Sequence, residues 1–266
     1  MSERIEGEEL LYEQRGNIAW LTLNRPQAMN SLNTAIISRF EDLLPAIGSN
    51  DYIRVVVITG AGPAFCAGAD LKEVLAGKDL PPGEPDLLDR VCDHVMDLLR
   101  DFPKPVIAAL NGITMAGGLE LTMCCDIVLA SEEAKIGDAH ANFGVYPGAG
   151  GAAILPRLVP HNVAKYLLFT GNTLSAKEMQ TYGLVNEVVP ADELESAATA
   201  LAELIASKSP IALKRMKQVA NASLDKSRDS ALQHEQVMLR KHMRSHDMNE
   251  GLRAFSEKRT PEFQGR

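Results

Sequence analysis

The chain has 266 residues, of which 45% are hydrophobic and 23% are charged, and its formal net charge is −8. The acidic balance excludes a general nucleic-acid-binding protein, because broad phosphate contact needs a basic face. The apolar runs are too short to span a membrane, and the N-terminus lacks the basic-then-apolar order of a signal peptide. We therefore expect a cytoplasmic protein that has neither a nucleic acid nor a membrane as its partner.

Up to about residue 130, the chain alternates strand and helix patterns, as an α/β protein does. Apolar alternation predicts the first strand, and continuous β-branched or apolar runs predict strands that are covered on both faces. Apolar residues at helical spacing predict the helices between them. The expected order is a strand in Leu11–Leu23, a helix over Asn33–Ile47, a strand over Arg54–Thr59, a helix capped by Asp70 and Glu73, a helix over Asp86–Arg100, a strand over Pro105–Leu110, a helix that begins near Gly118–Leu119, and a strand over Ile127–Ala130.

The remainder is expected to be mostly helical, apart from the glycine-rich stretch Gly144–Gly151. Residues 208–266 carry 13 Lys/Arg against 7 Asp/Glu, whereas residues 1–207 carry 14 against 28. We therefore predict an α/β core over residues 1–207 and a basic helical C-terminal segment over residues 208–266, which could serve a local anion site. Gly77–Pro85, rich in proline and glycine, is expected to be a mobile loop.

Motifs of several enzyme classes are missing. Phe65 stands where the dinucleotide-binding fingerprint needs its third glycine, and there is no phosphate loop, nucleophile elbow or HExxH motif. His242 and His246 lie four apart on an expected helix and could chelate a metal, but their basic neighbours oppose a cation, so we expect no metal site. The four cysteines lack C-x-x-C spacing and are expected to be reduced core residues.

Two glycine-rich turns follow two of the buried strands, at Phe65–Asp70 and at Met115–Glu120. Small residues let a ligand approach the backbone closely, and free N–H groups at the start of a helix attract negative charge. If the turns face each other, their N–H groups would form an oxyanion hole for a carbonyl that acquires charge. The alternative is two ordinary tight turns between a strand and a helix.

Glu120 follows the second turn and has apolar neighbours in sequence, among them Leu119, Leu121 and Met123. A carboxylate in such surroundings loses solvation and suits acid–base chemistry. The alternative is a first-turn glutamate that interacts with the helix dipole and reaches water.

The two turns lie in segments that strongly resemble the enoyl-CoA hydratase/isomerase, or crotonase, superfamily. These segments are AFCAGADLKE (Ala64–Glu73) and NGITMAGGLELTMCCDIVLAS (Asn111–Ser131). Further similar segments occur in the same order and extend the resemblance to essentially the whole chain. They are LNRPQAMNSL (Leu23–Leu32), GVYPGAGG (Gly144–Gly151), TGNTLSAKEMQTYGLVNEVVP (Thr170–Pro190) and AFSEKRTPEFQG (Ala254–Gly265).

The resemblance implies a crotonase-like spiral of ββα turns with a helical C-terminal trimerisation segment, in trimers that often pair as hexamers. It also implies an acyl-CoA thioester as substrate, with no cofactor other than the coenzyme A that the substrate carries. Backbone N–H groups of Ala69 and Gly117 would hold the thioester oxygen. Glu120 would be the first catalytic glutamate.

The chain departs from the family pattern at one important position. A second catalytic glutamate of the hydratases would stand four residues before Gly144, where this sequence has His140. Histidine can hold a water and exchange protons near neutral pH, so water addition remains possible. The alternative is that His140 only lines the pocket. Asp138 would orient His140 or act as an acid/base itself. The alternative is a structural role in a turn or a helix cap.

The resemblance also implies a binding site for the CoA portion. Lys72 would lie along the nucleotide, Ala28 would line the adenosine, and Phe255 and Lys258 would reach the adenine and phosphates, often those of a neighbouring subunit. Judged from the residues alone, the better interpretation of Lys72 is a surface lysine in the first turn of a helix, and that of Phe255 is an aromatic that packs a helix.

We therefore expect an enzyme that adds water to a 2-enoyl-CoA through an enolate held by Ala69 and Gly117, with Glu120 as the main acid/base and His140 assisting. One alternative on the same platform is a Δ3-Δ2 enoyl-CoA isomerase, for which one acid/base is enough. Another is an acyl-CoA hydrolase or lyase that uses His140. A non-catalytic acyl-CoA-binding protein is the alternative of a different class.

Overall fold

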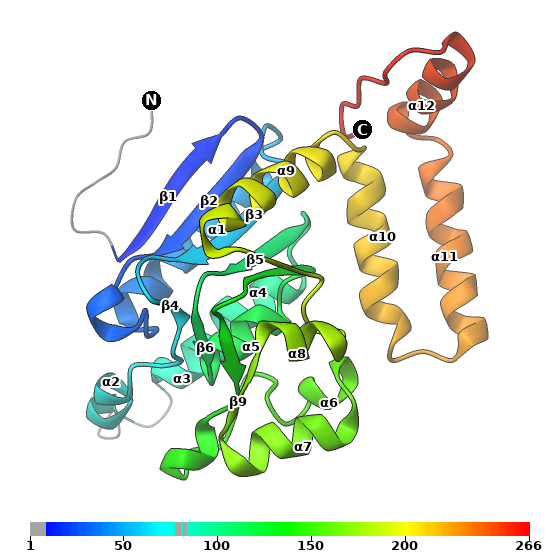
Figure 1. Cartoon of the computed structure of the whole chain (residues 1–266). Helices are drawn as coiled ribbons and strands as arrows, with labels where there is room; N and C mark the ends of the chain where they lie inside the picture. The colour runs from blue at the N-terminus through cyan, green and yellow to red at the C-terminus, as the bar shows by residue number, and fades with distance from the viewer. Residues whose placement is uncertain (1–8, 78–80, 82–83) are drawn as a thin grey trace.

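A six-stranded and a four-stranded β-sheet form the centre of the protein (Figure 1). The computed structural model describes residues 9–77, 81 and 84–266. The six-stranded sheet has the order β1-β2-β3-β5-β7-β10, in which β1 and β2 are antiparallel and the other neighbours are parallel. Its strands are β1 (Leu10–Arg15), β2 (Ile18–Leu23), β3 (Val55–Gly60), β5 (Val106–Leu110), β7 (Ile127–Ser131) and β10 (Glu187–Val189).

The four-stranded sheet has the order β4-β6-β8-β9, and only β9 pairs in the antiparallel direction. From β3 to β8, consecutive strands of the chain alternate between the sheets, so that β3, β5 and β7 are neighbours in one and β4, β6 and β8 in the other. This is the predicted spiral, and it confirms the α/β class. The strands are β4 (Ala64–Cys66), β6 (Ile113–Met115), β8 (Lys135–Gly137) and β9 (Thr173–Ser175).

Both faces of the six-stranded sheet are covered, which explains the continuous apolar run of β3. Successive side chains of a strand point to opposite faces, and Val55 and Val57 pack in a cluster with α9 (Leu194–Ala206). Val56 and Ile58 pack in the larger cluster on the other face, which includes α1 (Thr34–Ser49).

The remaining helices of this part of the chain are short and connect the strands. They are η1 (Pro26–Ala28), α2 (Leu71–Ala76), α3 (Leu87–Asp89), the π-helix η3 (Arg90–Met96), α4 (Asp97–Arg100), α5 (Gly117–Met123), η4 (His140–Phe143), α6 (Leu155–Leu158), α7 (His161–Thr170), α8 (Ala176–Thr181) and η5 (Ala191–Glu193). No helix in the described ranges is long and apolar enough to cross a membrane.

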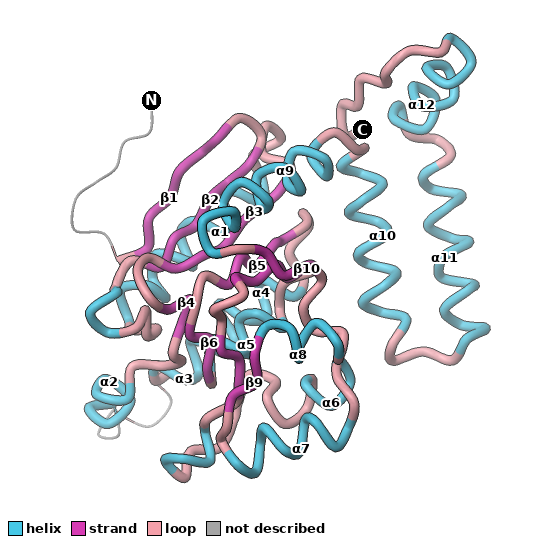
Figure 2. Tube along the Cα trace, in the orientation of Figure 1, coloured by secondary structure: helices cyan, strands magenta, loops and turns pink. Residues whose placement is uncertain are grey.

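The C-terminal helices are α10 (Pro210–Ser223), α11 (Arg228–His242) and α12 (His246–Glu257). They lie outside the part of the chain that contains the strands (Figure 2). Polar contacts attach α10 to this part, including an ion pair of 2.7 Å between Lys217 Nζ and Asp126 Oδ2. The division into units at residue 208 stays a prediction.

Three strand and helix predictions need correction. Leu11–Leu23 is a hairpin rather than one strand, because Gly16 takes a left-handed φ of 58° and turns the chain so that Arg15 pairs with Ile18. The sequence prediction lacks the short strands β4, β6, β8, β9 and β10, since three residues show no periodicity. Asp86–Arg100 is helical as predicted, but its middle is a π-helix.

Capping explains two further differences. Asp70 accepts a hydrogen bond from the Lys72 N–H and caps α2 as predicted, but the Glu73 carboxylate binds the backbone N–H and hydroxyl of Thr34 instead of completing the cap. His242 and His246 do not share a helix, because Ser245 caps a new helix that begins at His246. Most of the predicted loop at residues 77–85 lies outside the described residues.

Candidate active site

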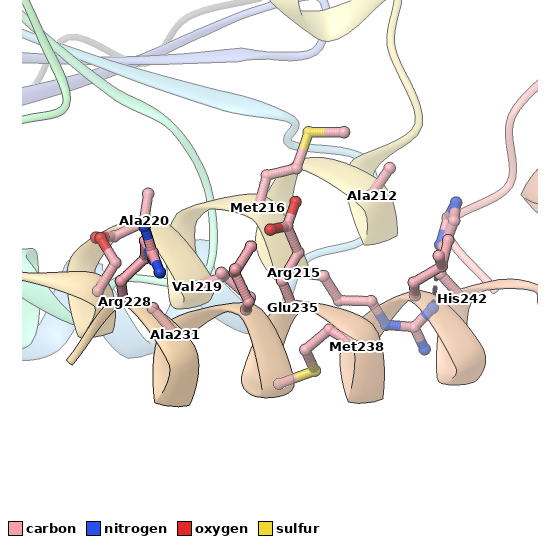
Figure 3. Close-up of a pocket in the computed structure, with 13 residues that line it drawn as sticks. Ala212, Arg215, Met216, Val219, Ala220, Arg228, Ala231, Glu235, Met238 and His242 are labelled. Carbon is pink, nitrogen blue, oxygen red and sulfur yellow. Dashed lines mark hydrogen bonds between the residues drawn. The ribbon is translucent and has the colours of Figure 1, made fainter. Parts of the chain in front are cut away.

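A cavity of about 280 Å³ lies where the two glycine-rich turns meet. Ala69 and Gly117 line it from the turns, and Glu120 and His140 line it with their side chains. A larger cavity of about 520 Å³ lies between α10 and α11, lined by helix side chains without any glycine-rich turn (Figure 3). Unlike this larger cavity, the smaller one combines glycine-rich turns with acid–base side chains.

The two turns are in direct contact. Gly68 has a φ of 107°, and a β-carbon added to it would lie 2.9 Å from the Ala116 Cβ and 3.1 Å from the Gly117 nitrogen. The Gly117 N–H is the first of α5 and has no partner within the helix. The parallel bridge at Ala69 uses the carbonyl of Gly68 and the N–H of Asp70. Among the described residues, neither the Ala69 nor the Gly117 N–H has a hydrogen-bond partner, as an oxyanion hole requires.

The second turn contains a strained residue that the sequence did not reveal. Ala116 has φ 49° and ψ −120°, a conformation that residues with a β-carbon rarely adopt. Such strain costs about 1–3 kcal/mol and concentrates at functional sites. Close packing fixes the turn, because a β-carbon on Gly118 would lie 2.1 Å from the Cys66 carbonyl oxygen.

Glu120 is buried, which is one of the two alternatives that its sequence neighbours left open, and it has hydrogen-bond partners. Its Oε1 accepts hydrogen bonds from the backbone N–H groups of Ala149 (2.8 Å) and Gly151 (3.0 Å). Its Oε2 lies 3.9 Å from Nε2 of His140. One carboxylate oxygen is therefore held by the backbone, and the other faces the histidine.

Asp138 holds the other side of the His140 ring. Its Oδ1 lies 3.0 Å from Nδ1 of His140, and only 1% of Asp138 is exposed. Burial of the ring opposes a positive charge, but the hydrogen bond and charge of Asp138 and the charge of Glu120 outweigh it and raise the pKa of His140. The result is an alignment of carboxylate, imidazole and carboxylate, with the histidine between two acids.

The sequence matches the enoyl-CoA hydratase/isomerase family over residues 13–266. The chain belongs to this family.

Named relatives and solved structures of the family agree with this assignment. A 2,3-dehydroadipyl-CoA hydratase of Escherichia coli is 37% identical over 258 residues, which are 97% of this chain and 99% of that protein. A probable mitochondrial enoyl-CoA hydratase of Dictyostelium discoideum is 38% identical over 250 residues, which are 94% of this chain and 88% of that protein. The crystal structure of an enoyl-CoA hydratase from Bacillus anthracis superimposes with a TM-score of 0.90 at 37% identity and covers 97% of this chain and 100% of that one. The protein is therefore an enzyme with the crotonase fold.

The structure places the expected CoA-binding residues of this family member in two regions. The loop of Ala28 lies against the first turn, where the Met29 carbonyl accepts the Ala67 N–H, and Lys72 is exposed at the start of α2. Phe255 and Lys258 belong to α12 and its C-cap, at the end of the molecule opposite α2 (Figure 1). A single chain does not bring these two residues to the cavity, and their role stays a prediction.

Several cavity residues are absent from the sequence prediction. Phe143 and Tyr146 line it, although 72% and 81% of their surfaces are exposed, and Cys92 lines it from the π-helix η3. Ala149 and Gly151, which donate to Glu120, belong to the glycine-rich stretch Gly144–Gly151. The resemblance of this stretch to the family was the one sequence feature that could have pointed to them.

Proposed function

We propose that the protein is an enoyl-CoA hydratase that adds water across the double bond of a 2-enoyl-CoA. The distance of 3.9 Å between Glu120 Oε2 and His140 Nε2 carries this proposal. It is too long for a direct hydrogen bond, but one water can bond to both atoms across it, because each such bond is about 2.8 Å long. A hydratase needs a water held in this way beside the reacting carbons.

In the proposed complex, the thioester oxygen accepts hydrogen bonds from the N–H groups of Ala69 and Gly117. These donors stabilise the negative charge that the oxygen gains when a nucleophile adds to Cβ. Loss of one oxyanion donor typically costs about 2.7–4 kcal/mol of transition-state stabilisation. Since the thioester itself acidifies Cα, the proposed reaction needs no metal or redox cofactor.

Protons move between Glu120, water and His140 in the proposed reaction. Glu120 takes a proton from the water as the water oxygen bonds to Cβ, and the double-bond electrons move to the thioester oxygen. The His140 imidazolium donates its Nε2 proton to Cα as the enolate collapses. Glu120 then returns its proton to His140, so that the product is a 3-hydroxyacyl-CoA and both residues regain their starting states. Asp138 keeps Nε2 of His140 directed towards Glu120.

The proposed oligomer is a homotrimer or a pair of trimers. Apolar side chains on the C-terminal helices are exposed in the single chain, including Met216 (64%), Leu239 (52%) and Phe255 (86%). A neighbouring subunit that covered them would also bring Phe255 and Lys258 towards the CoA site of another chain. Light scattering of the wild type and of Leu239→Glu tests this, and a monomeric wild type would contradict it.

A panel of acyl-CoA substrates tests the proposed activity. Hydration removes the conjugated absorbance of a 2-enoyl-CoA, isomerisation of a 3-enoyl-CoA creates it, and hydrolysis releases a free CoA thiol. We expect hydration to be the fastest of these reactions. Faster isomerisation or hydrolysis would replace the proposal with the corresponding alternative, and an absence of turnover on every substrate would indicate a non-catalytic binder.

A further inference from the structure

One wall of the cavity is apolar and would face the acyl chain in the proposed complex. Leu71 and Val74 line it from α2, and Leu88 and Val91 line it from α3 and η3. Phe143 adds an aromatic surface from η4. These side chains can contact hydrocarbon, but they offer no hydrogen bond to a polar group at the end of an acyl chain.

Among the described residues, the cavity also has no cation that is free to pair with a carboxylate. None of the described residues that line it is a lysine or arginine. Its imidazole, His140, already lies between Asp138 and Glu120. Among these described residues, a further anion in the cavity would therefore have no positive partner of its own.

Negative charges also act on this wall at the position of Cys92. This cysteine lines the cavity from the π-helix η3, a type of helix that frequently occurs at functional sites. Burial and then the negative charges of Glu120, Asp93, Asp89 and Asp97 raise the pKa of its thiol to about 11. The same charges that disfavour a thiolate at this position disfavour a substrate carboxylate.

We propose that the acyl site accepts 2-enoyl groups with an uncharged end and excludes acyl chains that end in a carboxylate. This inference rests on the proposed function. A carboxylate in the cavity would lose part of its solvation without a cation among the described lining residues to compensate, and Glu120 would repel it. The specificity would therefore differ from that named for the Escherichia coli relative, which is a 2,3-dehydroadipyl-CoA hydratase.

A matched pair of substrates tests the proposal. 2-Hexenoyl-CoA and 2,3-dehydroadipyl-CoA have the same chain length and differ only in a terminal methyl group or carboxylate. We expect kcat/KM for 2-hexenoyl-CoA to be at least about 100-fold higher, which is the discrimination a pocket reaches against one misplaced polar group. Equal values, or a preference for 2,3-dehydroadipyl-CoA, would overturn the inference.

Binding of the saturated analogues separates this inference from the proposed activity. Hexanoyl-CoA should bind more tightly than adipyl-CoA in calorimetry, whether or not any substrate turns over. If this order holds and neither 2-enoyl-CoA is hydrated, the hydratase function is wrong and the preference for uncharged acyl groups stands. The reverse order of affinities would overturn the preference even in an active hydratase.

A cation introduced at the wall tests whether charge is the cause. Leu88 is 36% exposed and lines the cavity, so Leu88→Lys adds an ammonium group without burying it fully. We expect this variant to raise the ratio of the affinity for adipyl-CoA to the affinity for hexanoyl-CoA at least about tenfold. The control Leu88→Met keeps the side chain neutral and should leave the ratio near that of the wild type. The same ratio in both variants would contradict an electrostatic origin.

Discussion

The substitution Asp138→Asn should change the pH at which His140 loses its catalytic proton. Asp138 Oδ1 lies 3.0 Å from Nδ1 of His140, and the carboxylate is almost fully buried. Although burial of the ring opposes it, this hydrogen bond and charge raise the pKa of His140. Because the proposed reaction uses the imidazolium as an acid, kcat should fall as the pH rises through this pKa. Asparagine removes the charge, lowers the pKa, and moves the fall in kcat to lower pH.

The buried contact sets the size of the effect. A hydrogen bond to a charged group contributes about 1.5–3 kcal/mol, and about 1.4 kcal/mol corresponds to a tenfold change. On the alkaline side of the profile, we therefore expect kcat of Asp138→Asn to be about 10- to 100-fold below that of the wild type. The assay is hydration of a 2-enoyl-CoA, followed by its absorbance at a series of pH values, with kcat and KM obtained separately.

A surface variant and the dependence of kcat on pH distinguish a positioning role of Asp138 from a purely structural one. Asp192 is exposed and lies far in sequence from the residues that line the cavity, so Asp192→Asn should keep the wild-type dependence of kcat on pH. If Asp138 had only a structural role, its loss would lower stability or the amount of active enzyme at every pH. An unchanged pH profile in Asp138→Asn would therefore refute the positioning role, even if the rate were lower.

Two further predictions concern glycines of the site. In Gly151→Ala, the new β-carbon would lie 2.5 Å from Asp138 Oδ2, so either the loop that bonds to Glu120 or the carboxylate that holds His140 must shift, and we expect kcat to fall at least about tenfold. In Gly118→Ala, the β-carbon would lie 2.1 Å from the Cys66 carbonyl oxygen, and overpacking of this kind should destabilise the protein by about 3 kcal/mol in denaturant unfolding.

A glycine without such contacts provides the control for both variants. A β-carbon on Gly48 in α1 would meet nothing closer than 3.4 Å, so Gly48→Ala should keep activity and leave stability unchanged or slightly higher. Wild-type stability in Gly118→Ala or wild-type kcat in Gly151→Ala would contradict the packing described for the turns.

Local sequence signals were sufficient for the elements that depend on local physics. The runs that became β3 and β5 are continuously apolar because both faces of their sheet are covered, and they were predicted within one residue. Asp70 was predicted as a helix cap, and the cap is formed. The burial of Glu120 was one of two alternatives that its apolar neighbours left open, and the structure decides for it.

Features that depend on distant parts of the chain were not predictable in this way. The backbone donors to Glu120 belong to Ala149 and Gly151, which lie 29 and 31 residues later in the chain. The positive φ of Ala116 results from the packing of the second turn, since alanine has no intrinsic preference for it. The two turns were evident from their glycines, and the resemblance to a family added the position of His140 without knowledge of the packing.

The measurement that tests the proposed mechanism most directly is the hydration rate of Glu120→Gln. Glutamine keeps an oxygen that can accept the two backbone hydrogen bonds, so the fold and the binding of a saturated acyl-CoA should be retained. It cannot take a proton from water, and we expect kcat to fall at least about 100-fold, whereas Glu132→Gln on the exposed surface should leave it unchanged. A wild-type rate in Glu120→Gln would contradict the role of Glu120 as the main acid/base.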